Sequence, residues 1–231
     1  MIPEVPLWIP TFFVTLAVCL SLVLPWALRR TSPGASPAAA SFLSLGWLGF
    51  TGLLAYTGRL HDFRSLPPPM ALLLAAMAVG SVLLCLSPWG KQLADRCTFA
   101  GLVGLQTFRL PLELVMHQAA VHHLMPPQMS YTGRNFDIVT GITALCLGIA
   151  LKKNANLSRK LIWLWNILGT ALLFNIVTIA ILSLPMPFRV FTNEPANVWV
   201  TYFPYVWLPC VMVAAAFIGH LLIFRKLLTS Q

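Results

Sequence analysis

Four polar residues, spaced three or four positions apart, interrupt a long apolar stretch of the chain. They are Gln106, Arg109, Glu113 and His117, and the stretch covers residues 97–123. On a helix that turns about 100° per residue, the four fall within roughly 80° of one another and form one polar stripe. Such residues are costly at membrane depth and usually face a bundle interior or a water-filled cavity. The stripe is therefore the candidate site.

The residue types in the stripe favour proton transfer or solute binding. Arg109 and Glu113 are four positions apart and can pair directly on a helix, which lowers the cost of burying either charge. One turn further on, His117 can exchange protons at physiological pH beside a carboxylate. Pro111 removes a backbone hydrogen bond between the pair, so we expect a kink that exposes a carbonyl. The alternative is that the pair of charges is a structural strut between helices.

A second set of polar residues is expected at the outer ends of the neighbouring segments. It consists of His61, Asp62, His122, His123, Arg134, Asn135 and Asp137. Histidine and carboxylate side chains suit several transition metals, but no histidine pair here has the spacing of a known metal motif. We therefore predict no metal and no other cofactor. Asn135 and Asp137 could alternatively cap the following helix, and His220, in the last apolar segment, has no evident partner.

The composition indicates an integral membrane protein. Of the 231 residues, 58% are hydrophobic and only 9% are charged, and apolar stretches long enough to span a bilayer recur along the whole chain. The formal net charge of +9 does not indicate nucleic-acid binding, because the basic residues lie in short clusters between apolar segments, as the positive-inside rule describes. We expect a lipid bilayer as the surroundings, and a multi-pass location in a bacterial inner membrane or a plasma membrane.

Seven apolar segments predict an all-α, polytopic membrane protein, with one bundle of seven transmembrane helices over residues 1–231. The predicted spans are 8–28, 39–58, 70–89, 97–123, 136–151, 161–184 and 199–224. An N-terminus outside and a C-terminus in the cytoplasm put most loop lysines and arginines inside. If the fourth segment instead lay on the membrane surface, six spans would remain and the basic cluster at residues 152–160 would fall outside. Seven spans are therefore favoured.

Three functions are compatible with this pattern. The stripe beside Pro111 favours a small-solute or proton-linked transporter, in which Arg109 and Glu113 are the central charges, His117 exchanges protons and Gln106 is a polar contact. The second is a membrane-embedded enzyme that acts on a lipid or a quinone. The third is a non-catalytic accessory or assembly subunit, which binds another membrane protein or a second copy of this chain. No GxSxG, HExxH, P-loop or dinucleotide motif occurs, so a function other than catalysis is favoured.

Overall fold

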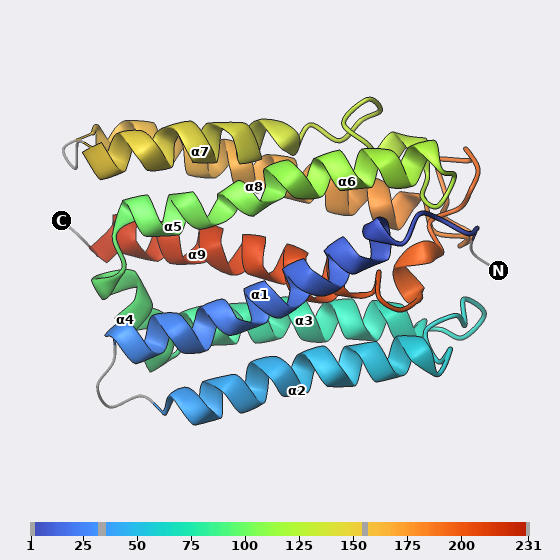
Figure 1. Ribbon diagram of the computed structural model, residues 1–231, viewed down its shortest axis with the longest axis horizontal. Helices are drawn as coiled ribbons and strands as arrows, with labels where there is room; N and C mark the ends of the chain where they lie inside the picture. Colours follow the sequence, from blue (N-terminus) through green and yellow to red (C-terminus); the bar gives the residue numbers. More distant parts are fainter. Residues whose placement is uncertain (1–2, 32–35, 154–156, 230–231) are drawn as a thin grey trace.

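Runs of leucine, valine, alanine and phenylalanine make up the long helices of the protein. In the computed structural model, which describes residues 3–31, 36–153 and 157–229, these helices lie side by side along one axis (Figure 1), and no described residue is in a strand. Six of the described helices are long and apolar enough to cross a membrane. The expected all-α fold is confirmed, and the six helices agree with a protein that lies in a membrane.

The helices follow one another with short connections. They are α1 (Trp8–Thr31), α2 (Pro37–Tyr56), α3 (Pro69–Leu86), α4 (Pro88–Arg96), α5 (Phe99–Leu105), α6 (Arg109–Val121), α7 (Ile138–Lys153), α8 (Arg159–Leu182) and α9 (Ala214–Thr229). α5 and α6 join into one apolar helix of 23 residues, and a π-helical segment, Leu208–Val213, leads into α9. α7, which corresponds to the predicted fifth span, has 16 residues and is not among the six.

The predicted spans differ from the helices by a few residues at their ends, and in two of them the sequence explains the difference. The third is predicted to reach residue 89, but α3 ends at Leu86 because Ser87 caps α4, where its Oγ accepts a hydrogen bond from the Gly90 N–H at 3.2 Å. The last is predicted to begin at residue 199, but its long helix begins at Leu208. A proline within residues 199–207 explains the later start, because proline lacks the N–H that a continuous helix needs.

Two groups of helices lie on either side of α9. Figure 1 shows α1, α2 and α3 in one group and α5, α6, α7 and α8 in the other. α9 packs against α3, α4, α5 and α8, and the π-helical segment packs against α1 and α3. α9 is therefore the element through which the two groups make much of their contact.

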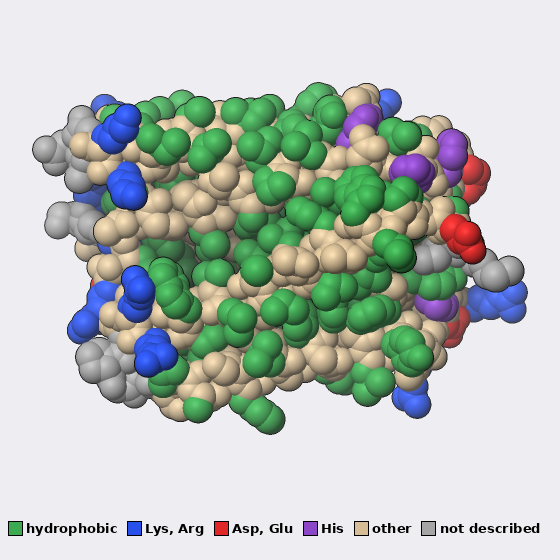
Figure 2. Space-filling model, viewed as in Figure 1, with side chains coloured by type: hydrophobic (Ala, Val, Ile, Leu, Met, Phe, Trp, Pro, Cys, Tyr) green, Lys and Arg blue, Asp and Glu red, His purple; other side chains and the backbone are tan. Residues whose placement is uncertain are grey.

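The two ends of the bundle differ in charge. Figure 2 shows most lysine and arginine side chains along one end, and histidine together with acidic side chains at the other, and we call these the basic end and the histidine end. The basic end holds Arg29, Arg30, Arg96, Lys152, Lys153, Arg159, Lys160 and Lys226. Between the two ends, large apolar side chains such as Phe42, Leu53 and Phe174 are more than half exposed. An apolar belt with charged ends suits a bilayer.

Candidate functional site

The polar stripe lies on a helix that changes its winding at its centre. α5 passes into a 3-10 turn over Gln106–Phe108, and α6 follows directly. Pro111, in the first turn of α6, has no N–H to donate to the preceding turn. The helix therefore changes its winding immediately before the turn that contains Pro111, where the sequence predicts a kink.

Arg109 is the most connected side chain of the stripe. It is 1% exposed, and its guanidinium forms a buried salt bridge with Asp137, in which Nε donates to Oδ2 at 2.6 Å and Nη2 donates to Oδ1. Arg109 therefore does not form the salt bridge with Glu113 that the sequence predicts. A guanidinium fork binds best to a carboxylate that presents both oxygens, and Asp137, just before α7, does so from across the helix interface.

Glu113 is buried beside this salt bridge without a cation of its own. It is 2% exposed, and its Oε2 accepts a hydrogen bond from Asn135 Nδ2 at 2.6 Å. Among the described residues its Oε1 accepts no hydrogen bond and the carboxylate forms no salt bridge. The Oδ1 of Asn135 accepts from the Asp137 N–H at 3.0 Å, in the loop just before α7. Asn135 is therefore a member of the buried site, and this bond fixes the loop rather than the first turn of α7.

His220 of α9 belongs to the same network, although the sequence indicates no partner for it. It is fully buried, and its Nε2 lies 2.8 Å from Arg109 Nη1. Because a guanidinium can only donate, Nε2 accepts, and the ring proton is on Nδ1, which lies 2.8 Å from Asn166 Oδ1. Asn166 Nδ2 in turn donates to the His220 carbonyl at 3.1 Å. The imidazole is thus held neutral in one tautomer and one orientation.

Gln106 joins the stripe to α9 as well. It is fully buried, and its Nε2 donates to the Ala216 carbonyl at 3.0 Å, while its Oε1 has no partner among the described residues. α9 can approach it closely because residue 219 is a glycine, whose missing Cβ leaves the space that the Gln106 amide fills. The network of buried polar side chains therefore connects α6, α7, α8 and α9.

His117 lies outside this network, nearer the histidine end. It is partly exposed, and its Nδ1 lies 2.9 Å from Ser130 Oγ and 3.4 Å from Thr132 Oγ1. Its ring also lies against Tyr131, with 4.7 Å between the ring centroids. The predicted stripe is thus divided into three buried members and one member at the surface.

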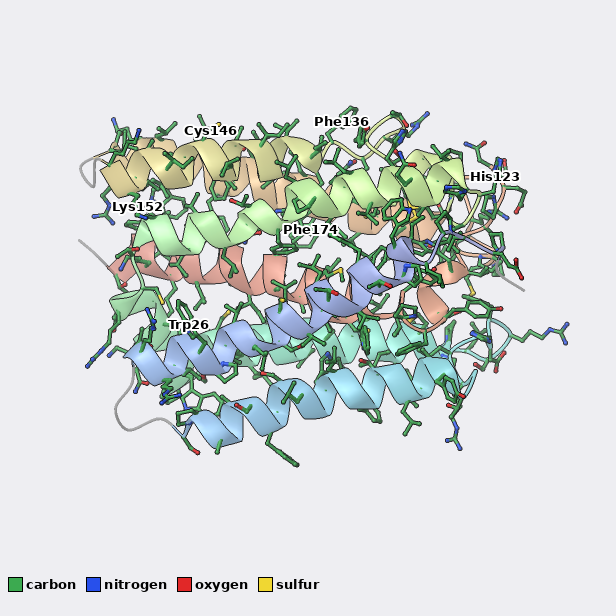
Figure 3. The ribbon with its side chains drawn as sticks, viewed as in Figure 1. Trp26, His123, Phe136, Cys146, Lys152 and Phe174 are labelled. Carbon is green, nitrogen blue, oxygen red and sulfur yellow. The ribbon has the colours of Figure 1, made fainter. Side chains whose placement is uncertain are left out.

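The second set of polar residues is only partly gathered. Asn135 and Asp137 join the buried network, whereas Asp62 accepts hydrogen bonds from the backbone N–H groups of Arg64 and Ser65 in its own loop. The bond from Arg64 is the main reason that the pKa of Asp62 lies below its ordinary value. The others lie apart at the histidine end: His61 stacks on Tyr202, Arg134 lies over Phe191, and His122 and His123 follow α6, where Figure 3 labels His123.

The described residues contain no group of three or more His, Cys, Asp or Glu side chains that could hold a metal ion. The buried network itself has one guanidinium, two carboxylates and one neutral imidazole, on Arg109, Glu113, Asp137 and His220. With the guanidinium paired to Asp137, the carboxylate of Glu113 is the charge left over. The site can therefore take up one positive charge, either a proton or a cationic group.

A cavity of about 330 Å³ lies over these residues. Arg109, Glu113 and Asp137 form part of its wall, and apolar side chains of α3, α6, α8 and the π-helical segment form most of the rest. Ala75 of α3 and Ile181 of α8 line it and are exposed, so it opens sideways between these two helices. We call it the acidic cavity.

A second cavity, of about 420 Å³, lies nearer the basic end. Its wall is again mostly apolar, with the hydroxyls of Ser21, Ser44 and Ser81 as polar groups. Met77 of α3 lines both cavities, and the π-helical segment contributes residues to both. α3 orders the two along the bundle, because it lines the acidic cavity over residues 70–78 and the second cavity over residues 76–84. We call the second one the serine cavity.

Residues 67–228 match a family described as a domain of unknown function (DUF8737), and the chain belongs to that family. The match covers most of the chain, from the start of α3 almost to the end of α9, and so includes every residue of the buried network. No curated protein and no solved structure matches the chain.

Proposed function

We propose that this member of the DUF8737 family is a multi-pass membrane carrier, which exchanges a small solute for a proton or moves the two together. The observation that carries the proposal is the pair of cavities in series, with Met77 and the π-helical segment as their shared wall and a cation-free carboxylate in one of them. A carrier needs a binding site that can be reached from each side in turn, with a movable partition between.

The partition has the properties of a movable element. Methionine has an unbranched, flexible side chain that fills irregular gaps and changes rotamer readily. π-helical turns such as Leu208–Val213 are rare and are frequently found at functional sites. A change at Met77 together with the π-helical segment would connect the acidic cavity to the serine cavity.

Glu113 supplies the coupling. A buried carboxylate without a cation is costly, so the empty carrier is most stable when Glu113 holds a proton. Release of that proton creates a negative charge next to the solute site, and solute binding and protonation are therefore linked. His117, within one turn of Glu113 and partly exposed, is placed to pass protons between this site and the water at the histidine end.

We further propose seven spans, with the basic end in the cytoplasm. The proposal is supported by the two ends of the chain, because α1 begins at the histidine end and α9 ends at the basic end, as an odd number of crossings requires. α7 is then a seventh crossing in addition to the six long helices, although its 16 residues give a length of only about 24 Å. The positive-inside rule assigns the basic end to the cytoplasm of a cell membrane, which leaves the N-terminus outside.

Proton flux in vesicles tests the carrier function. The protein is reconstituted into liposomes that contain a pH-sensitive dye, and a panel of amines, carboxylates, sugars and amino acids is added outside in turn. At least one class is expected to change the internal pH at a rate that depends on the protein and is lost in Glu113→Gln. Glu194→Gln, a change of the same type at a 72% exposed side chain, is the control and should behave as the native protein. If correctly folded protein moves protons with none of the classes, the carrier function is wrong.

A further inference from the structure

We infer that the acidic cavity binds a small lipophilic amine, a molecule with an apolar body and one ammonium group. The inference rests on the proposed carrier function, because it names the class of solute that the carrier would move. It comes from three features of the cavity: the charge at its wall, the polarity of the remaining wall, and the kind of hydrogen-bonding atom left open.

The charge at the wall selects a cation. Glu113 offers Oε1 without a donor and forms no salt bridge among the described residues. The cation nearby is already engaged, since Arg109 binds Asp137 with two nitrogens and His220 with the third. An anionic solute would therefore face an extra carboxylate without a free cation. An ammonium group brings one positive charge and several N–H donors, which is what Glu113 lacks.

The rest of the wall selects an apolar body. It is formed by side chains such as Leu74, Leu112, Met116, Leu173, Ile176 and Val200. A sugar or an amino acid would leave most of its polar groups without hydrogen-bond partners against such a wall, and each of them would lower the affinity. The volume of about 330 Å³ is at the lower end of the range for ligand pockets, so the body is small.

The second open polar atom in the wall is also an acceptor. Asn197 lines the cavity and is 2% exposed, and its Nδ2 donates to the Ala180 carbonyl at 2.8 Å. Its Oδ1 has no partner among the described residues. An acceptor at this position suits a donor on the solute, such as a second N–H of the ammonium group or a hydroxyl. Glu113 and Asn197 together therefore favour a solute that donates hydrogen bonds.

The route of entry agrees with this class. The opening between Ala75 and Ile181 faces the apolar belt, where the bilayer would lie. A neutral amine dissolves in the bilayer, enters sideways and is protonated inside the cavity by the proton that Glu113 holds. The proton leaves the carboxyl oxygen and the amine nitrogen gains it, so an ion pair forms from two neutral groups without any change in total charge.

Binding of cyclohexylamine to the purified protein in detergent tests the inference, with cyclohexanol and cyclohexanecarboxylate as matched compounds. Thermal unfolding and calorimetry are expected to show binding of the amine at least tenfold tighter than of either matched compound. Glu113→Gln should weaken amine binding at least tenfold, whereas Glu194→Gln should leave it unchanged. Equal binding of all three compounds, or equal amine binding by Glu113→Gln, would overturn the inference.

A second variant keeps the test decisive if Glu113→Gln does not fold. Ala75→Phe places a large side chain at the exposed opening, where it disturbs no buried contact, and should weaken amine binding by a similar factor. The two proposals can fail separately. If the amine binds but no solute moves protons in vesicles, the site stands and the carrier function fails. If carboxylates or sugars drive proton flux that needs Glu113, and the amine does not bind, the carrier stands and the amine is wrong.

Discussion

At the scale of single residues, the guanidinium of Arg109 joins segments that lie far apart in the chain. Its partners are 28 and 111 positions away, on Asp137 and His220. Asp137 binds two of its nitrogens and His220 the third, so the side chain is fixed in one orientation. This arrangement positions Glu113, one turn along α6, at the wall of the acidic cavity rather than in the salt bridge. Arg109 and Asp137 therefore hold the helix interface together, while a separate residue, Glu113, is the acid that a solute can reach.

The first prediction compares this buried salt bridge with an exposed one. Asp137→Asn should lower the free energy of unfolding by about 3–5 kcal/mol, because it removes the carboxylate that binds two nitrogens of the buried Arg109 guanidinium. Glu194→Asn removes the partner of Arg189 in a salt bridge whose carboxylate is 72% exposed, and should cost no more than about 1 kcal/mol. Thermal unfolding in detergent measures both. Similar small losses for the two variants would mean that the Arg109 salt bridge does not hold the bundle together.

The members of the stripe could be predicted from the sequence, but their partners could not. Polar residues in an apolar stretch are visible in any sequence, and Gln106, Arg109 and Glu113 are indeed buried. Spacing along one helix can only propose a partner on the same helix, so it favours Glu113 for Arg109. Asp137 and His220 come from other segments, and their contact depends on packing between helices. The sequence did contain one signal for His220: a polar residue within an apolar segment is a candidate for a functional site.

At the scale of elements, α9 approaches α8 closely at one glycine, and this contact sets the position of His220. A Cβ added to Gly169 would lie 2.7 Å from His220 Cε1 and 3.0 Å from Thr140 Cγ2. Both distances are shorter than atoms normally approach, so only glycine fits without a shift of the imidazole. A glycine in the middle of a helix usually weakens it, and here the close approach of the two helices explains its presence.

The second prediction follows from that contact. Gly169→Ala should destabilise the protein by about 1–3 kcal/mol, because the added methyl group displaces a side chain that is held by two hydrogen bonds. Gly46→Ala in α2 is the control: nothing lies within 4 Å of its added Cβ, so the change should be neutral or stabilising by up to about 1 kcal/mol. Chemical or thermal unfolding in detergent compares the two. A Gly169→Ala variant as stable as Gly46→Ala would contradict the close packing of α8 and α9.

The third prediction concerns the partition between the cavities. Met77→Ala should join the acidic cavity to the serine cavity and increase the passive proton leak of vesicles that contain the protein, because Met77 lines both. Vesicles that contain Met77→Leu should show little extra proton leak, because this substitution conserves the volume of the side chain. Met70→Ala is the matched control, because Met70 lines only the acidic cavity and its removal opens no connection. The leak is measured with an internal pH dye after a pH step, and equal leaks for Met70→Ala and Met77→Ala would argue against Met77 as the partition.

The positions of the elements were predicted better than their ends and their windings. The length of each apolar stretch predicts the corresponding long helix, and the change to a 3-10 turn lies next to Pro111, where the sequence predicts a kink. The π-helical segment has no such signal, because it depends on neighbours that pack around it rather than on local spacing. The short helix α4 did have one, because Ser87 before Pro88 is a typical start of a helix. The late start of the last long helix could have been found from the proline in residues 199–207, which disfavours one continuous helix from residue 199.

At the scale of the whole molecule, the number of crossings decides which groups share a side of the membrane. The sequence supports seven spans through the distribution of lysine and arginine, whereas length and composition of the described helices support six. The difference is α7, which is short for a bilayer but begins near the buried network and ends with Lys152 and Lys153 at the basic end. If α7 crosses, then Asp137 at its start lies at membrane depth, and the salt bridge with Arg109 is screened from water.

The fourth prediction tests this crossing directly. His123→Cys and Lys152→Cys, each made in a variant without the five native cysteines, place one thiol before α7 and one near its end, at the two positions labelled in Figure 3. In sealed vesicles of one orientation, a membrane-impermeant maleimide should label one of them and spare the other, and labelling of both should follow permeabilisation. By the positive-inside rule, the thiol at residue 123 should be the one reached from outside the cell. Labelling of both thiols from the same side would show that α7 does not cross. The chain would then cross an even number of times, the termini would share one side, and the basic end would no longer lie in a single compartment.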